Sequence, residues 1–340
     1  MTSMLKIIQP GLMTTLQDLG RVGYQALGIP VSGALDPIAL RFANRLVGNP
    51  ESEAALEILG MGPHFTVAGG VRLALVGGGN LIVNDRPPIA AGASVTVGDG
   101  VEVKILGPLA GPAYLSVAGG FDVPMFLGSR STYPRNNLGG FEGRPLRPRD
   151  AIPLSLSAPL PGPERRLAQA WDYAETARVR VVLGPQDDYF TEAAIVQFLE
   201  ERFTVTKDAD RMGLRLDGPA LAHSRGFDIV SDGIVNGSIQ VPGTGRPIIL
   251  LADHQSAGGY PKIATVISAD LPRLARAVPG TVLTFAAVTV AEAEAARRQL
   301  EARFAEHPIE NWSGSLPGEL DEASLYAENL ISGVVDGAAV

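Results

Sequence analysis

The sequence predicts a mainly β protein with a few helices, built as a barrel or sandwich of short strands. Forty glycines and 26 prolines are spread along the 340 residues, so turns are expected at short intervals. Short apolar runs alternate with these turns from residue 55 to about residue 157, a pattern typical of all-β architectures and not of a doubly wound sheet. Hydrophobic residues make up 46% of the chain, which is enough for a substantial core.

The first 48 residues are expected to hold one strand, one long loop and one helix. Residues 5–8 are mostly apolar and are followed by Gln9 and a Pro-Gly pair, as expected for a short strand. The segment TTLQDLGRVGYQALGIPVSGALD is rich in glycine and is interpreted as a loop. Asp36 is a good N-cap, Pro37 suits the first helical position, and an apolar stripe runs to Gly48. A helix is therefore predicted over residues 37–47.

The next hundred residues complete a predicted N-terminal β lobe, residues 1–160, with that single helix. Its further strands are predicted at 56–59, 71–76, 81–83, 94–97, 101–105 and 113–117. Residues 159–176 contain proline, glycine and polar residues, and this segment is the best candidate for a linker between two lobes.

A second β lobe with helices is predicted over residues 177–306. Thr191 caps an expected helix that runs to residue 203, and an Ala/Glu/Arg-rich helix is predicted over 290–306. Residues 307–340 are acidic and weakly periodic, and are expected to form a peripheral tail. Between these elements the sequence predicts a strand at 178–183, strands near 203–206, 214–216, 228–231, 239–241, 248–252, 263–267 and 281–287, and a short helix near 270–277.

Composition excludes several classes of function. A net charge of −8 argues against nucleic-acid or anionic membrane surfaces. The chain has no cysteine, so it has no disulfide, thiolate nucleophile or cysteine-bound metal. Its four histidines form no HExxH pattern, no GxxxxGK[ST] phosphate loop occurs, and no apolar run reaches about 18 residues. A cytoplasmic protein without its own metal or recognisable nucleotide loop is expected.

The strongest candidate site is NGSIQVPGTGRPIILLADHQSAGGYPK, residues 236–262. Polar groups of several kinds follow a short apolar strand there, beside paired glycines that let the backbone approach a ligand. Asp253 and Lys262 are the candidate catalytic acid/base residues, and Lys262 could equally hold a carboxylate or phosphate oxygen. Gln255 and Tyr260 are candidate substrate-binding residues. The alternative is an ordinary solvated turn in which Asp253 and Lys262 form a surface ion pair.

A second polar loop, GSRSTYPRNNLGGFEG at residues 128–143, could bind an oxyanion. Arg130 and Asn136 are its candidate substrate-binding residues, because the arginine fork suits carboxylates. The alternative is that these side chains satisfy loop carbonyls. Arg211, in KDADRMGLRLDG, is interpreted as part of a structural turn with an ion pair that holds a hairpin. Asp18 and Arg21 in the first loop are open to either a structural or a functional role.

Several long motifs in order resemble the KipA / allophanate hydrolase subunit 2 family. They are QPGLMTTLQDLGRVGYQALGIPVSGALD, NRLVGNPESEAALEI, LSVAGGFDVPMFLGSRSTYPRNNLGG, GPQDDYF, DRMGLRLDG and SIQVPGTGRPIILLADHQSAGGYPKIATVI. The resemblance runs from about residue 6 to residue 287, and it adds Gln240 to the candidate substrate-binding residues. This family includes the C subunit of bacterial 5-oxoprolinase and part of the carboxyltransferase region of urea carboxylase. Leu214 and the Ser256–Ala257 pair depart from the family pattern without removing a charged group.

The resemblance implies cyclophilin-like β-barrel lobes and an enzyme subunit that works with partners. These partners are a KipI-like protein (the B subunit of 5-oxoprolinase) and a third hydrolase component (the A subunit). The implied reaction is the ATP-dependent conversion of 5-oxo-L-proline to L-glutamate, with ATP used by the complex. One alternative is a carboxyltransferase subunit that acts on urea or a similar amide, with biotin on a partner. Another is a regulatory antagonist of a kinase inhibitor, which would need only a binding surface.

Overall fold

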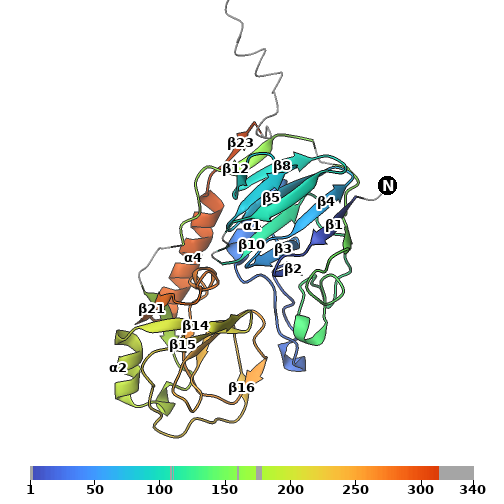
Figure 1. Cartoon of the computed structure of the whole chain (residues 1–340). Helices are drawn as coiled ribbons and strands as arrows, with labels where there is room; N and C mark the ends of the chain where they lie inside the picture. The colour runs from blue at the N-terminus through green and yellow to red at the C-terminus, as the bar shows by residue number, and fades with distance from the viewer. Residues whose placement is uncertain (1–2, 108, 110, 159–160, 174–177, 314–340) are drawn as a thin grey trace, which may run out of the picture.

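The computed structural model describes residues 3–107, 109, 111–158, 161–173 and 178–313. Two bodies of short strands lie one above the other in Figure 1, and a long helix, α4 (Val290–Glu306), runs along one side of both. Within the described residues the strands fall into three larger sheets and one small two-stranded sheet, accompanied by only four α-helices. The prediction of a mainly β fold with a few helices is confirmed.

The first lobe is a sandwich of two antiparallel sheets. One sheet has the order β11 (Ala151–Pro153), β1 (Met4–Gln9), β4 (His64–Ala68), β9 (Glu102–Leu106), β6 (Asn80–Val83) and β7 (Ile89–Ala90). The other has the order β2 (Met13–Gln17), β3 (Ala55–Leu59), β10 (Ala113–Val117), β5 (Val71–Val76), β8 (Ala93–Val97), β12 (Glu164–Leu167) and β23 (Ile309–Trp312). Leucine, isoleucine, valine and phenylalanine side chains from both sheets meet in one core between them.

The second of these sheets is buried on both faces. Along β5, Leu73 and Leu75 point into the sandwich core, whereas Ala74 and Val76 pack against helix α1 (Pro37–Val47). This follows from the period-2 alternation of a strand. The helix begins where the sequence predicts, because the Asp36 carboxylate accepts a hydrogen bond from the backbone N–H of Ala39 at 3.1 Å. Two residues of α4, Leu300 and Phe304, complete this layer.

The second lobe is built on one eight-stranded sheet that curls back on itself. Its order is β21 (Val282–Leu283), β14 (Phe203–Asp210), β15 (Gly213–Asp217), β18 (Ile248–Leu250), β17 (Ser238–Gln240), β20 (Lys262–Val266), β13 (Val179–Leu183) and β22 (Phe285–Ala287). The strands at the two ends of this order, β21 and β22, follow each other directly in the chain. The sheet is therefore a nearly closed barrel around a separate apolar core, in agreement with the predicted barrel class.

The two lobes also contain shorter elements. Helix α2 (Glu192–Glu200) is capped by Thr191 and contributes Phe198 to the barrel core, and it ends three residues earlier than predicted. The remaining elements are α3 (Leu271–Leu274), the 3₁₀ turns η1 (Gln25–Leu27), η2 (Pro134–Asn136) and η3 (Asp187–Tyr189), and a small sheet of β16 (Asp232–Gly233) and β19 (Ala257–Gly258).

Three predictions for local elements are wrong. Strand β2 lies inside the segment interpreted as a loop, where every residue from Thr14 to Gln17 is buried. Strand β4 was not expected, although His64–Ala68 alternates between half-buried and buried residues as an amphipathic strand does. Residues 228–231 form no strand; the short β16 follows them instead.

The predicted linker and tail are also corrected. Strand β12 lies within residues 159–176, and strand β23 lies within residues 307–340. The two strands pair with each other, from Glu164 opposite Trp312 to Leu167 opposite Ile309. The chain thus leaves the first lobe, builds the second lobe, and returns to the edge of the first. The rest of the expected tail, residues 314–340, lies outside the described residues.

Replacing Thr289 with alanine should lower the free energy of unfolding by about 1 kcal/mol. The Thr289 side chain accepts a hydrogen bond from the backbone of Glu292 at 3.2 Å, and the Glu292 carboxylate accepts one from the backbone of Thr289 at 2.7 Å. This capping box orders the start of α4. Urea unfolding followed by circular dichroism measures the loss. Thr289→Ser keeps the oxygen and should stay near the wild type; equal losses in both variants would contradict the role of the cap.

Candidate functional site

A buried guanidinium, that of Arg211, joins the two lobes. It sits in the turn between β14 and β15 of the barrel, and Glu57 lies on β3 of the sandwich. The guanidinium donates to Asp253 through Nε at 2.8 Å and through Nη2 at 3.0 Å, and it also contacts the Glu57 carboxylate through Nη1. A fourth hydrogen bond, from Nη2 to the carbonyl of Gly33, measures 2.7 Å. Arg211 is thus shared by two carboxylates in a site closed to solvent.

Electrostatics hold Arg211 in its charged form. Burial lowers the pKa of the guanidinium, but the negative charges of Glu57 and Asp253 outweigh this effect and raise the pKa above its ordinary value. The pairing with Asp253 is bidentate, so it fixes geometry as well as charge. Both carboxylates are at most 4% exposed. A buried charge cluster of this kind is costly to form unless every group in it is paired.

The cluster continues through Glu57 to the start of helix α1. Glu57 also accepts from the hydroxyl of Tyr114 at 2.6 Å and from the backbone N–H of Leu35 at 2.9 Å. The Tyr114 oxygen in turn accepts from the backbone N–H of Asp36 at 2.8 Å. Burial and the charge of Glu57 raise the pKa of Tyr114 well above its ordinary value. This phenol therefore remains a donor and serves to position Glu57.

Asp253 also connects to the polar loop that follows β10. The Ser32 hydroxyl donates to Asp253 at 2.6 Å and lies 3.2 Å from the carbonyl oxygen of Thr132. Burial, and after it the charge of Asp253, raises the pKa of Tyr133. Segments near residues 32, 57, 132, 211 and 253 thus converge on one place between the lobes, although they are far apart in the sequence.

The Asp18 carboxylate orders the beginning of that loop. It accepts from the backbone N–H of Gly20 at 2.8 Å and of Arg130 at 2.6 Å. It also accepts from the hydroxyls of Ser129 at 2.7 Å and Ser131 at 2.5 Å. Four neutral donors therefore satisfy Asp18, and its role is to join the segment after β2 to residues 129–131.

Lys262, at the start of β20, has a different partner from the one considered in the sequence. Its Nζ donates to Asp232 at 2.7 Å, and its backbone N–H donates to the Gln186 side chain at 3.1 Å. The lysine is 1% exposed, whereas the Asp232 side chain is 51% exposed. The interpretation of Asp253 and Lys262 as a surface ion pair is therefore wrong, because both are buried and each pairs with another residue. Their candidate role in catalysis remains a prediction.

The other residues of the 236–262 segment lie in different environments. Gln240 is buried on β17, and its amide makes only a long contact of 3.5 Å to the carbonyl of Tyr260. Gln255 and Tyr260 are exposed, with 40% of Tyr260 accessible to solvent. His254 is buried, and burial lowers its pKa, so the ring is neutral at pH 7. Within this segment Asp253 and Lys262 are thus buried, whereas Gln255 and Tyr260 are exposed.

The two candidate residues in the 128–143 loop lie in different environments. Arg130 donates to the carbonyl of Val123 at 2.7 Å and to Glu53 at 3.1 Å. Its guanidinium therefore links this loop to the segments that carry these two residues. Asn136 is exposed within η2. For Arg130 the structure matches the alternative interpretation, in which the side chain satisfies local partners. The substrate-binding role of both residues stays a prediction.

Sequence reasoning underestimated Arg211 and missed Glu57. Asp210 does form the expected turn, since its side chain accepts from the backbone of Met212 at 2.8 Å, but Arg211 pairs across the lobes and not within the hairpin. One signal was available for Glu57: a carboxylate in the middle of the apolar run ALEIL, whose neighbours are all buried. A charge in such a strand usually has a buried partner.

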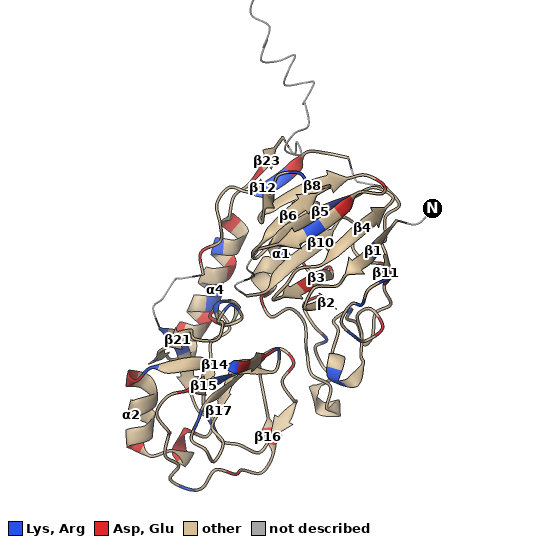
Figure 2. Ribbon diagram, in the orientation of Figure 1, with Lys and Arg blue, Asp and Glu red and all other residues tan. Residues whose placement is uncertain are grey.

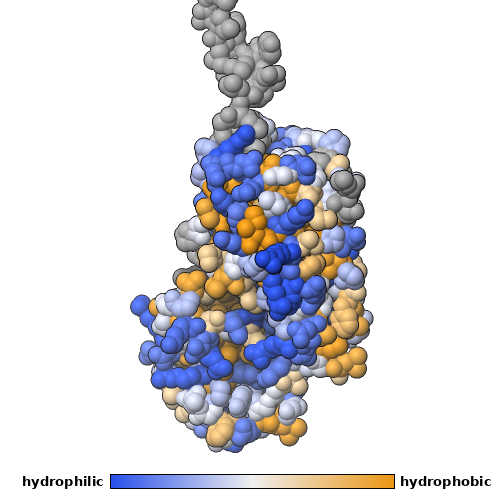
Figure 3. Space-filling view, turned by 45° about the vertical axis from the view of Figure 1, so that its right-hand side comes forward, coloured by the Kyte–Doolittle hydropathy of each residue, from blue (hydrophilic) through white to orange (hydrophobic). Residues whose placement is uncertain are grey.

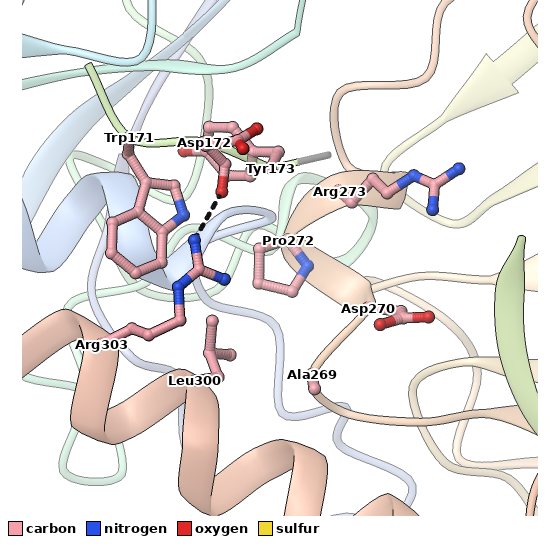
Figure 4. A pocket seen from close by; sticks show the side chains of 9 residues that line it. All are labelled: Trp171, Asp172, Tyr173, Ala269, Asp270, Pro272, Arg273, Leu300 and Arg303. Carbon is pink, nitrogen blue, oxygen red and sulfur yellow. Dashed lines mark hydrogen bonds between the residues drawn. The ribbon is translucent and has the colours of Figure 1, made fainter. Parts of the chain in front are cut away.

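Charged residues of both signs are interspersed over the two lobes (Figure 2), and hydrophobic and hydrophilic side chains alternate on the face in Figure 3. A small cavity lies elsewhere, between α3, α4 and residues 171–173. Figure 4 shows Arg303 in that cavity beside Trp171, with its guanidinium donating to the carbonyl of Asp172 at 3.2 Å. This cavity holds none of the predicted site residues. In the described part of the chain, no cluster of side chains suits a metal ion and no helix could cross a membrane.

Comparison with known proteins identifies the family. The model of the carboxyltransferase domain, subdomain A and B, matches residues 27–287. The chain belongs to this family. The match covers both lobes and includes Arg211, Glu57, Asp253 and Lys262, and the resemblance inferred from the sequence motifs is confirmed.

Individual members of the carboxyltransferase-domain family match most of the chain. The C subunit of 5-oxoprolinase from Escherichia coli is 37% identical over 307 residues, which is 88% of this chain and 96% of that protein. The protein of the same name from Haemophilus influenzae is 34% identical. The crystal structure of the Kluyveromyces lactis urea amidolyase superposes with a TM-score of 0.81 at 31% identity, over 94% of this chain. This chain spans only 20% of that larger protein.

Proposed function

We propose that this protein is the C subunit of a 5-oxoprolinase, the enzyme that opens 5-oxo-L-proline to L-glutamate. The observation that carries the proposal is the match over nearly the full length of two proteins that bear this name, at 37% and 34% identity. The larger urea amidolyases are matched over at most a fifth of their length, for example 17% for that of Lachancea kluyveri. Coverage of nearly the whole of the two bacterial relatives supports the first group.

The proposal includes partner subunits and ATP. The names of the two bacterial relatives imply an enzyme with several different subunits. The resemblance of the sequence motifs implies that the others are a KipI-like B subunit and a third component, the A subunit. No GxxxxGK[ST] loop occurs in this chain, so we assign ATP to the complex and not to residues of this chain. Activity only in the assembled complex is part of the same proposal.

Hydrolysis of the lactam C–N bond requires particular chemical groups from the protein. Water adds across the C–N bond, so the carbonyl oxygen gains charge while the ring nitrogen accepts a proton on leaving. Lys262 is the candidate to hold an oxygen of the substrate or to supply that proton, because it is a buried cation whose partner, Asp232, reaches solvent. Asp253 is the second candidate, held in a fixed orientation by Arg211 and Ser32.

A second function is favoured by one specific observation, the superposition on urea amidolyase at a TM-score of 0.81. In that case the chain would be a carboxyltransferase subunit that acts on urea or a similar amide, with biotin on a partner protein. A regulatory antagonist of a kinase inhibitor is the remaining candidate, and it would need no chemistry at Lys262.

Purified complex of this chain with its B and A subunits separates the three candidates. We expect release of glutamate and ADP when 5-oxoproline and ATP are present, and no ATP hydrolysis when urea replaces 5-oxoproline. Omitting this chain should abolish glutamate release. ATP hydrolysis stimulated by urea in the presence of a biotinyl carrier would favour the carboxyltransferase. A stable complex inactive with both substrates would leave the regulatory role.

A further inference from the structure

Arg21 is a second buried guanidinium beside the Asp253 cluster, and most of its hydrogen-bonding capacity is unused. It is 1% exposed. Its Nη2 donates to the carbonyl of Ser131, but Nε and Nη1 have no hydrogen-bond partner among the described residues and are closed off from solvent. The backbone fits tightly around the group: a Cβ at Gly139 would lie 2.5 Å from Nη2, at a φ of +63° that already favours glycine.

The buried N–H groups of Arg21 that lack an acceptor carry information about the role of this residue. A buried N–H without an acceptor costs about 1–3 kcal/mol, and more on a charged group. Burial lowers the pKa of Arg21, and Asp18 and Asp253 offset this effect only by charge, without a hydrogen bond to the guanidinium. Arg211 shows the contrast, since all three of its nitrogens have acceptors. An arginine with a structural role would be expected to have an acceptor for each of its nitrogens, as Arg211 does.

Gln17 offers an unused acceptor near the same place. Its amide nitrogen donates to the hydroxyl of Thr15 and the carbonyl of Thr132, each at 3.0 Å, while its buried Oε1 has no partner among the described residues. Arg21 and Gln17 thus reach the consecutive carbonyls of Ser131 and Thr132, which places their polar ends within about 10 Å of each other. Unpaired donors with an unpaired acceptor are the complement of an amide, which presents one C=O and one N–H.

The charge balance of the cluster indicates which oxygen of the substrate suits Arg21. The carboxylates of Asp18, Glu57 and Asp253 outnumber the guanidiniums of Arg21 and Arg211. A substrate carboxylate would add a further negative charge to a site with little water, where repulsion is strong. A lactam carbonyl is neutral when it binds and gains negative charge only when its carbon is attacked, and buried donors stabilise such charge most effectively.

We propose that Arg21 is a substrate-binding residue whose unpaired N–H groups donate to the lactam carbonyl oxygen of 5-oxoproline, with the Gln17 amide oxygen available to the lactam N–H. The inference rests on the proposed function and adds to it a residue at the reacting group. It places substrate binding on the sandwich side of the junction between the lobes, opposite Asp253 of the barrel lobe.

The test compares Arg21→Met and Arg21→Lys in the assembled complex. We expect Arg21→Met to lower kcat/KM for 5-oxoproline about 10²-fold, and Arg21→Lys to recover part of the loss. The urea midpoint of Arg21→Met should equal or exceed that of the wild type, since an unsatisfied buried cation is removed. A structural role predicts the opposite, a lowered midpoint. Arg246→Met, which breaks an exposed ion pair with Asp217, is the matched control and should change neither quantity.

Two competitive inhibitors show whether Arg21 contacts the lactam carbonyl oxygen or the carboxylate of the substrate. 2-Pyrrolidinone has the lactam without the carboxylate, and cyclopentanecarboxylate has the carboxylate without the lactam. The proposal requires that Arg21→Met weaken inhibition by 2-pyrrolidinone and leave that by cyclopentanecarboxylate unchanged; the reverse result would assign Arg21 to the carboxylate and overturn it.

The two proposals fail in distinguishable ways. If the wild-type complex does not turn over 5-oxoproline, the proposed function fails and this inference fails with it. If the wild type is active and Arg21→Met retains kcat/KM within threefold, only the role of Arg21 is refuted.

Discussion

Replacing Arg211 with methionine should destabilise the protein more than any other single change considered, by about 3–5 kcal/mol. The substitution keeps most of the volume but leaves Glu57 and Asp253 buried without their shared cation. It also removes the Arg211–Glu57 salt bridge, which joins the barrel to the sandwich. Urea unfolding should show the loss as a large drop in midpoint, and the complex should lose activity because this chain is unfolded or its lobes separate.

Two further variants make this expectation specific. Arg246→Met removes an exposed ion pair of the same lobe and should change stability by less than about 1 kcal/mol. The triple variant Arg211→Met, Glu57→Gln, Asp253→Asn should be more stable than Arg211→Met alone, because no buried charge is then left unpaired. A loss below about 1 kcal/mol for Arg211→Met would show that the cluster contributes little to stability.

Replacing Lys262 with methionine should reduce kcat/KM for 5-oxoproline by about 10²–10⁴-fold, the range expected when an acid/base group is removed. Stability should change little. The lysine stem is buried and methionine replaces it with similar shape, while the former partner Asp232 is half exposed and can be hydrated. Steady-state kinetics of the assembled complex, together with the urea midpoint, measure both effects.

A lysine in a similar pair provides the control. Lys104 contacts Asp85 at 2.6 Å in the first lobe, on the surface, so Lys104→Met should leave kinetics unchanged. Lys262→Arg separates two roles: a point charge that holds an oxygen is preserved in part, whereas proton transfer is lost, since arginine does not release its proton. Wild-type kinetics in Lys262→Met would remove Lys262 from the site.

The sequence predicted the fold class and those elements that carry their own local signals. Helix α4 was predicted with its observed ends because it has a capping residue and a strongly helical composition, and α1 because of Asp36, Pro37 and Gly48. Strands β5 and β10 are mainly apolar runs, the first bounded by glycines and the second preceded by proline. Strands β2 and β12 are polar in composition, and only their pairing with strands distant in the sequence gives them a regular structure. No local sequence pattern therefore predicts them.

The role of the 236–262 segment as a site stays a prediction, but the burial of its charged residues can be compared with the sequence. The polar segment after β18 does contain two buried charged residues, Asp253 and Lys262. Their partners could not be predicted, because the pairing of β15 with β18 brings Arg211 to Asp253, and Asp232 lies in the separate small sheet of β16 and β19. Arg21 lay in a loop open to either role, and only the hydrogen-bond pattern of the folded chain distinguishes a satisfied arginine from an unsatisfied one.

The pairing of β12 with β23 makes the barrel lobe an insertion in the first lobe. The chain enters the barrel from β12 and comes back through α4 to β23, and these two strands are neighbours in one sheet. Both ends of the inserted lobe are therefore anchored close together. A single break in the connection from β12 to β13 would leave the lobes tethered through α4. Their facing residues, Arg211 and Glu57, would stay at a high local concentration relative to each other.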